Sequence, residues 1–505
     1  MISLNAWPKA GAALALGAFA TLGFAPVDLA VAMPAGLVGL FLLAEGAAPR
    51  RAALTGWLFG LGYFVVGVSW IYVSMHDIGG MPAPLAGLAV LLFAAYLAIF
   101  PALACMAAAR LGSTHWTHRL LVLPACWTIA EWLRGWLFTG FPWLATGYAG
   151  TGGTFAGYAP LFGVYGVGFL YVFAAGAVVD FLRAPANEPL RRRLRPRDAL
   201  LPLALVAGLG LAQVQWTMPD GKPVKVALLQ GNIAQDLKFE EARFDSTLAM
   251  YKRLIDAHPA ELTILPETAL PRMLGAIPRN YLDSLQATAR AAGANLIVGV
   301  PLAESRERYF NSAISLGAAP SQRYDKAHLV PFGEFIPWGF RWFVDAMNMP
   351  LGDFTRGSAM PTPLQLGTQR VAVNICYEDL FGEEIIRQLP QASLLANISN
   401  IAWFGASLAP HQHLQISRMR ALETGRPMLR ATNTGMTAVI DVRGRIADQL
   451  PPFTEGALIA RVQGYSGATP YVQAGNWPII VLCLLALAPA LLRRARPSPA
   501  PAGTR

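Results

Sequence analysis

The stretch Val371-Ala-Val-Asn-Ile-Cys376-Tyr-Glu-Asp379 decides how the fold of this chain is interpreted. It starts as a short, largely apolar run, which predicts a strand, ends at a thiol and then turns acidic. Two other segments follow the same plan. Leu262-Thr-Ile-Leu-Pro-Glu267 ends in a carboxylate, and Tyr324-Asp-Lys326-Ala-His-Leu-Val-Pro-Phe-Gly-Glu334-Phe carries a lysine and a second carboxylate. Together they offer a base, an oxyanion partner and a nucleophile.

The surrounding region, residues 222–470, alternates short β-rich runs with helical stretches, which indicates an α/β layered domain. Helical periodicity is expected over 239–258, 278–292 and 410–425. The expected strands are Val224–Gln230, Leu262–Leu265, Asn295–Val300, Asn311–Leu316, Val371–Ile375, Leu394–Ile398 and Thr437–Asp441.

The three polar residues at these segment ends form a coherent set for acyl transfer through a thioester. A free thiol has a pKa of ~8.5 and attacks only as thiolate, so a base must take its proton. Glu267 can be that base if burial raises its pKa. Lys326 can stabilise the thiolate and then the oxyanion, and the N–H of Tyr377 is a second donor. Each residue alone is more often structural, and their joint occurrence carries the hypothesis.

The composition of the whole chain predicts a membrane protein, and the long apolar runs lie in residues 8–216 and 477–492. Of 505 residues, 54% are hydrophobic and 14% charged, with a mean hydropathy of +0.41. The net charge of +10 comes from basic residues beside apolar runs, which favours a membrane over nucleic acid as the explanation. A span needs ~20 apolar residues. The expected spans, about eight, are 8–25, 27–47, 52–74, 84–110, 118–137, 160–182, 198–216 and 477–492.

Lysine and arginine predict the orientation of these spans. The loops after even-numbered spans are basic, and the 138–159 loop after the fifth span has neither residue. The positive-inside rule then places both termini in the cytoplasm and residues 217–476 on the opposite side. We expect a bundle over 1–216, a catalytic domain over 217–470 and a last span with a basic tail over 471–505. The orienting residues are Arg50, Arg51, Arg110, Arg119, Arg183, Arg191, Arg192, Arg193, Arg195, Arg197, Arg493, Arg494 and Arg496.

Few other polar groups suggest chemistry. Glu131 and Arg134 fall inside a span and are either a structural i, i+3 pair or a polar handle for a lipid headgroup. His411 and His413 are two residues apart, do not share a helix face, and are interpreted as polar residues at a helix start. No metal ligand set and no phosphate loop is found in the sequence, so neither a metal nor a cofactor is expected.

Several motifs resemble the nitrilase (carbon–nitrogen hydrolase) superfamily, and with the flanking spans the chain resembles its apolipoprotein N-acyltransferase family. The match from Lys326 to Pro337 is the most specific. The other marks are Trp70-Ile-Tyr, Glu131-Trp-Leu-Arg-Gly, Phe141-Pro-Trp, Gln230-Gly-Asn, Leu265-Pro-Glu-Thr, Cys376-Tyr-Glu, Trp403-Phe-Gly, Arg420-Ala-Leu-Glu-Thr-Gly-Arg-Pro and Thr432-Asn-Thr-Gly.

The resemblance implies an αββα sandwich on a helical membrane bundle of the bacterial inner membrane, with the catalytic domain in the periplasm. It implies Glu267 as general base, Lys326 as oxyanion stabiliser and Cys376 as nucleophile. The supporting residues that it implies are Glu334, Tyr377 and Glu378, and candidates for substrate contact are Asn400, Trp403, Phe404 and Trp338.

The implied reaction has two halves. Cys376 takes the sn-1 acyl chain of a phospholipid, typically phosphatidylethanolamine, and the α-amine of a diacylglyceryl-cysteine at the N-terminus of an apolipoprotein then receives it. Two positions depart from the family pattern: Ile401 replaces an acid, and Phe239 replaces a tryptophan and so lacks its N–H donor. The apolar loops Ile401–Phe404 and Phe335–Trp338 are expected as lids or lipid-facing walls.

Two alternatives remain at this point. A membrane-tethered amidase or nitrilase would use the same three residues but release its product to water. A transporter with a soluble substrate-binding domain would need polar residues across several spans, and the spans here are almost free of charge apart from Glu131, Arg134 and Asp180.

Overall fold

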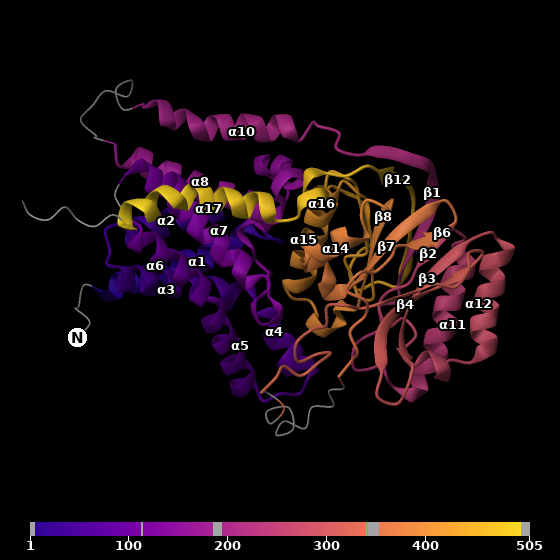
Figure 1. The fold of residues 1–505 in the computed structure, drawn as a ribbon. Coiled ribbons are helices and arrows are strands. Elements are labelled where there is room, and N and C mark those ends of the chain that lie inside the picture. Colours follow the sequence, from indigo (N-terminus) through magenta and orange to yellow (C-terminus); the bar gives the residue numbers. More distant parts are fainter. Residues whose placement is uncertain (1–5, 113–114, 185–193, 340, 342–352, 496–505) are drawn as a thin grey trace, which may run out of the picture.

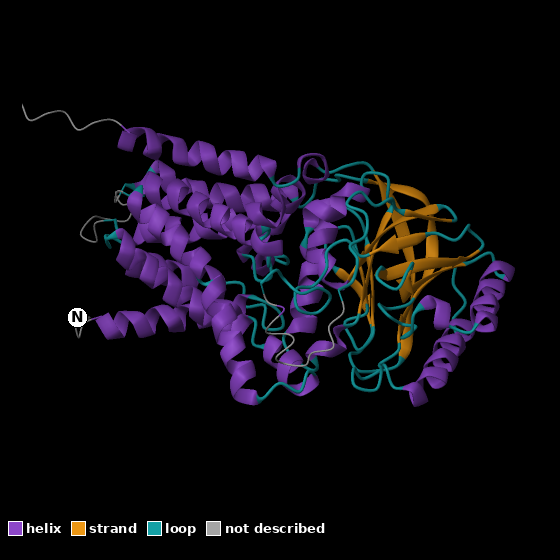
Figure 2. Ribbon diagram, turned by 60° about the horizontal axis from the view of Figure 1, so that its bottom comes forward, coloured by secondary structure: helices purple, strands orange, loops and turns teal. Residues whose placement is uncertain are grey.

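The computed structural model describes residues 6–112, 115–184, 194–339, 341 and 353–495. A helical bundle built from the N-terminal half and the last helix lies at one end, and two β-sheets flanked by helices lie at the other (Figures 1 and 2). Four arginines used for the orientation, Arg191, Arg192, Arg193 and Arg496, fall outside the described residues.

The two sheets have six strands each and the same plan. Three adjacent strands in each run parallel, β1-β2-β3 and β7-β8-β9, and antiparallel strands extend them to order β12-β1-β2-β3-β4-β5 and β11-β10-β9-β8-β7-β6. The strands are β1 Met218–Gln230, β2 Leu262–Ile264, β3 Asn295–Ala303, β4 Tyr309–Gly317, β5 Arg323–Asp325, β6 Leu364–Leu366, β7 Gln369–Ile375, β8 Leu394–Ser399, β9 Met428–Thr432, β10 Ala438–Ile440, β11 Ile446–Gln449 and β12 Gly456–Ser466.

The sheets pack face to face, and helices cover their outer faces. Val226, Ile264, Val373 and Ile398 are among the fully buried side chains between the sheets, as expected for strands with both faces covered. Helices α11 (Glu241–Ala257) and α12 (Arg279–Ala291) cover the first sheet. Helices α14 (Gly382–Ile385) and α15 (Ala409–Thr424) cover the second. The αββα expectation is therefore confirmed.

Each segment expected to span the membrane contains a helix. Among the described residues, Ala83–Arg110, Thr154–Leu182 and Trp477–Arg494 are long and apolar enough to cross a bilayer, and Pro49–Gly67 with Trp70–Ile78 would add a fourth span, bent by 51°. The helices are α1 Ala6–Ala20, α2 Ala32–Ala44, α3 Pro49–Gly67, α4 Trp70–Tyr72, α5 Ala83–Leu97, α6 Ile99–Arg110, α7 Leu123–Arg134, α8 Ala159–Leu182, α10 Leu200–Leu211, α16 Pro470–Ala474 and α17 Trp477–Ala495.

Helix α15 joins the two halves of the molecule. Pro410 lies in its first turn, and Gly425, with φ of 61°, ends it in the left-handed conformation that glycine adopts most readily. All its residues except His411 and Arg418 are buried, because one face packs on the second sheet and another on α8. The residues after the expected nucleophile are thereby held against the bundle.

The 140–146 loop of the bundle reaches this junction and is held by Glu131 and Arg134. Arg134 donates to the carbonyls of Phe141 and Trp143, and Glu131 accepts from the N–H and hydroxyl of Thr146. The two side chains lie 3.9 Å apart and are buried. These contacts favour the structural interpretation of the pair over a lipid handle.

Candidate active site

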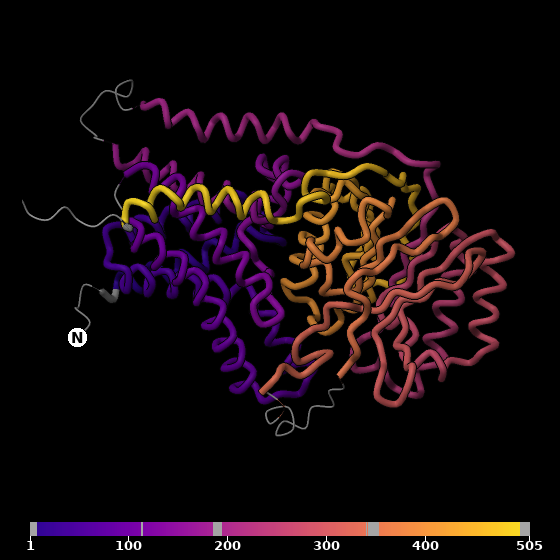
Figure 3. Tube along the Cα trace, viewed as in Figure 1, coloured from indigo at the N-terminus to yellow at the C-terminus, as the bar shows by residue number. Residues whose placement is uncertain are grey.

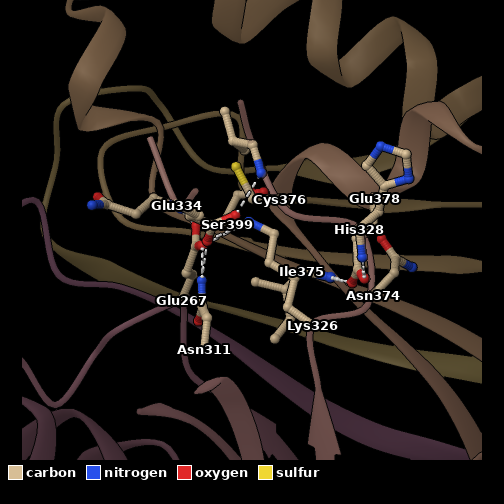
Figure 4. Close-up of polar contacts among 12 residues, drawn as sticks. Glu267, Asn311, Lys326, His328, Glu334, Asn374, Ile375, Cys376, Glu378 and Ser399 are labelled. Atoms are coloured by element: carbon tan, nitrogen blue, oxygen red, sulfur yellow. Dashed lines mark hydrogen bonds and ion pairs between the residues drawn. The ribbon is translucent and has the colours of Figure 1, made fainter. Parts of the chain in front are cut away.

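The three residues expected to carry the chemistry lie just past the ends of strands from both sheets. Glu267 follows β2, Lys326 follows β5 and Cys376 follows β7. Figure 4 shows their side chains, with Glu334, pointing toward one another. Gly299 on β3 allows this approach, because a Cβ there would lie 2.8 Å from the Cα of Glu267.

Lys326 sits between the two carboxylates. Its Nζ is 2.9 Å from Oε1 of Glu334 and 3.4 Å from Oε1 of Glu267, and its side chain is 1% exposed. These neighbours raise its pKa even though burial opposes the charge. Lys326 is therefore a permanent cation, suited to a developing oxyanion rather than to proton transfer.

Glu267 is oriented by donors on both oxygens. Asn311 donates to Oε1 at 2.7 Å, and the N–H of Asn400 donates to Oε2 at 2.8 Å. Burial pushes the pKa of Glu267 upward, but the charge of Lys326 and these hydrogen bonds outweigh it and hold the pKa below its usual value. The expectation that burial raises this pKa is therefore wrong, and Glu267 rests as an ionised base.

The thiol of Cys376 rests in its protonated form. Burial, followed by the negative charge of Glu267, raises its pKa, and Lys326 counters this only partly. A free thiolate is thus not the resting nucleophile. A thiol with a raised pKa needs a base to take its proton as sulfur attacks, and Glu267 is the ionised carboxylate expected for that role.

Two supporting carboxylates fix the loop that carries Lys326. Glu334 accepts the second Asn311 bond at 2.7 Å and the N–H of Val330 at 2.9 Å. Glu378 accepts from the N–H groups of Ala327 and Ile375, both at 2.7 Å. Burial raises the pKa of Glu378 to about 7, although these bonds favour its charged form.

The remaining expected residues contact the bundle or lie at the surface. Tyr377 donates its hydroxyl to the carbonyl of Gly140 at 2.9 Å, so its side chain contacts the bundle. The ring of Phe404 lies 4.7 Å from that of Trp70, also in the bundle. Trp403 is 42% exposed and Trp338 is 98% exposed.

Asn400, expected to contact substrate, is bound to other protein groups and orients the carboxylate of Glu267. Its side-chain N–H donates to Gln235 and its side-chain oxygen accepts from Asn433. Both polar ends of the amide thus have protein partners, while its backbone N–H orients Glu267. Of the two departures from the family pattern, Ile401 is buried and Phe239 is exposed.

Lys238, which the sequence analysis did not select, lies beside Glu267. It is 2% exposed, and its Nζ donates to the Glu267 carbonyl at 3.1 Å. Burial lowers its pKa to about 8, against the attraction of Glu267. Its only signal in the sequence is its place between Leu237 and Phe239, and a lysine between apolar residues is usually a solvated one.

Replacing Lys238 with methionine should stabilise the fold at pH 7. A folded-state pKa of about 8 against the ordinary 10.5 means that burying the ammonium is costly below pH 8. A shift of this size corresponds to about 3 kcal/mol. Since the unfolded chain keeps its proton longer, wild-type stability should rise between pH 8 and 10.5. Thermal unfolding at pH 7 and 10 tests this: K238M should gain on wild type at pH 7 and by less at pH 10. An equal difference at both values would contradict it.

Comparisons with known proteins identify the family of the chain. Residues 16–177 match the apolipoprotein N-acyltransferase N-terminal domain, and residues 225–471 match the carbon-nitrogen hydrolase family. The apolipoprotein N-acyltransferase of Ralstonia nicotianae is 49% identical over 95% of this chain and 92% of its own. That of Nitrosomonas europaea is 47% identical over 96% and 97%. The chain belongs to the apolipoprotein N-acyltransferase family.

Proposed function

We propose that this N-acyltransferase moves the sn-1 acyl chain of a phospholipid to the α-amine of the diacylglyceryl-cysteine at the N-terminus of apolipoproteins, with Glu267, Lys326 and Cys376 as the catalytic residues. The observation that carries the assignment is the ammonium of Lys326 held 2.9 Å from one carboxylate and 3.4 Å from another beside the only cysteine of the 217–470 region. Phosphatidylethanolamine is the proposed donor.

In the first half-reaction, Sγ of Cys376 attacks the ester carbonyl while Glu267 takes its proton. The oxyanion that forms faces the ammonium of Lys326 and the backbone N–H of Tyr377. Collapse breaks the bond to the glycerol oxygen, and Glu267 returns the proton to that leaving oxygen. A thioester and a lysophospholipid result.

In the second half-reaction, the neutral α-amine attacks the thioester carbonyl. The C–N bond forms, and the amine gives a proton to Glu267. The C–S bond then breaks and the proton passes to sulfur, which restores the enzyme and leaves an amide. A free α-amine has a pKa near 8, so a neutral fraction exists at neutral pH.

A bilayer location is the other half of the proposal: about eight spans in the bacterial inner membrane, both termini in the cytoplasm and the catalytic domain in the periplasm. Arg110, Arg183 and Arg493 support this orientation, because they lie at the ends of α6, α8 and α17. Those ends point away from the sheets (Figure 3), and arginine is enriched on the cytoplasmic side. The expected boundaries at 216/217 and 470/471 remain part of this proposal.

A transfer assay separates the proposed activity from that of a hydrolase. Purified enzyme in detergent is given phospholipid labelled at sn-1 and a synthetic diacylated lipopeptide with a free amine. We expect the label to appear in the peptide amide, and little free fatty acid without peptide. Label released only as fatty acid, with or without peptide, would instead identify a hydrolase.

The exposed indoles of Trp338 and Trp403 should bind the lipid donor. Burying one large apolar side chain is worth about 1.5–3 kcal/mol, so each of W338A and W403A should raise KM for phospholipid about tenfold to a hundredfold, and the double variant by more. Acylation at saturating lipid should change much less. The control is Arg279→Ala, at the start of the exposed α12 far from the bundle (Figure 1). Acylation kinetics equal to wild type in the double variant would refute this role.

A further inference from the structure

The backbone of Cys376 is held in an unusual conformation by groups behind the site. Its φ is 55°, in the left-handed region that side chains other than glycine seldom adopt. Such strain persists only where the surroundings impose it. Two donors converge on the Cys376 carbonyl: Nδ2 of Asn397 at 3.0 Å and Nε2 of His413 at 3.2 Å.

His413 is itself fixed by Asp379, three residues after Cys376. Its Nε2 lies 2.7 Å from Oδ1 of Asp379. Both neighbours of Nε2 are acceptors, so this nitrogen carries the hydrogen. Burial, and then the charge of Arg430, lower the pKa of His413, which agrees with a neutral ring.

Asp379 is held in turn by two further donors. Ser417 donates its hydroxyl, and Arg430 donates from Nη1 at 3.3 Å, to Oδ2. Arg430 also donates to Oδ1 of Asn397 at 2.8 Å, so the two donors of the Cys376 carbonyl belong to one network. Its members are at most 1% exposed, and the hydrogen bonds among them hold Asn397 and His413 in place behind the Cys376 carbonyl.

The network also meets the bundle. The ring of Trp143 lies 5.5 Å from that of His413, and its Nε1 donates to Gln412 at 2.7 Å. His413 therefore contacts the nucleophile's backbone on one side and the 140–146 loop on the other. The hydrogen bond from His413 reaches the carbonyl and not Sγ, which argues against a role as the base for the thiol.

We propose that His413, held by Asp379, is a positioning residue that locks the peptide between Cys376 and Tyr377, so that Sγ and the Tyr377 N–H face the same reacting carbonyl. This inference rests on the proposed role of Cys376 as nucleophile. It adds a role for a histidine whose hydrogen bonds, in the described part of the chain, reach the backbone of Cys376 but neither Glu267 nor Lys326. Misplacing reacting groups by about 1 Å can cost about a hundredfold in rate.

The test measures thioester formation in single turnovers with saturating phospholipid, in detergent, for three variants of the full chain. His413→Leu fills the same space with an apolar side chain that has no donor. His413→Gln offers an N–H that can reach the same oxygens. His411→Gln, at a neighbouring position that is not buried, is the matched control.

We expect H413L to acylate about a hundredfold more slowly with the same half-saturating phospholipid concentration. H413Q should recover most of this rate, and H411Q should match wild type. If H413L does not fold, Ser417→Ala, which removes one donor from Asp379, should still slow acylation several-fold at an unchanged half-saturation.

Each other outcome overturns the proposal. If H413L acylates at the wild-type rate, His413 is only a packing residue. The same conclusion follows if H413L and H413Q lose the same amount of rate and both have a lower folded fraction in thermal unfolding. A wild-type rate in S417A would do the same if H413L does not fold. The Cys376→Ala variant run in parallel keeps the two proposals separate. If it still transfers acyl chains, the proposed function itself fails.

Discussion

Acyl transfer should fall by about 10⁴-fold or more when Cys376 is replaced with alanine. Removal of a catalytic nucleophile has costs of this order, because no neighbouring group can replace the covalent step. Here the carboxylates of Glu267 and Glu334 and the ammonium of Lys326 would remain in place around an inert methyl group. The measurement is the rate of label transfer from phospholipid to a diacylated lipopeptide.

The chain supplies its own controls for this substitution. Cys105 and Cys483 are buried thiols in α6 and α17. Cys105→Ala and Cys483→Ala remove the same atom without touching the site, so both should keep wild-type kinetics per folded molecule. A Cys376→Ala enzyme that still transfers acyl chains at a comparable rate would contradict the assignment of the nucleophile.

Replacing Glu267 with glutamine should lower the rate of thioester formation by about 10²- to 10⁴-fold, the usual contribution of a general base. The amide is close in shape to the carboxylate and can still accept the N–H of Asn400. It cannot take the thiol proton, and the raised pKa of Cys376 makes that transfer necessary.

The pH dependence gives a second result for the same residue. A base works in its ionised form, and the pKa of Glu267 lies below its usual value of 4.5. Wild-type acylation should therefore show no loss from Glu267 protonation between pH 5 and 7. Single-turnover rates across this range, with Glu304→Gln on the surface as the control, test both points. An E267Q rate within tenfold of wild type would remove Glu267 from the base role.

The strands with regular apolar patterns were predictable from the sequence. Val371–Ile375 and Leu394–Ile398 lie within β7 and β8, because a buried parallel strand is a run of apolar residues. Strand β9 was missed, since the buried Arg430 interrupts its pattern and obtains its partners only from other elements. Strand β12 was missed as well, since Gly464 and polar residues break its alternation.

The residues of the site were likewise predictable only in part. Glu267, Lys326 and Cys376 were accessible because each ends a recognisable local pattern. Asn311 was expected only as a strand residue, and His413 only as a polar residue of a helix. Their roles depend on contacts between residues far apart in the chain, such as the 37 positions between Cys376 and His413. No local pattern encodes such contacts.

The same limit applies to the charge states. Burial alone predicts a raised pKa for Glu267, but the effect of Lys326 reverses the direction. Lys326 is 59 positions away in the sequence, and a shift set by a buried neighbour requires the neighbour's place in space.

Intact-protein and peptide mass spectrometry of the enzyme after exposure to phospholipid, without any acceptor, tests the central claim most directly. The account predicts one fatty acyl group on Cys376, removed by neutral hydroxylamine and lost as an amide when a diacylated lipopeptide is added. An acyl group on another residue, or none under conditions in which transfer proceeds, would contradict it.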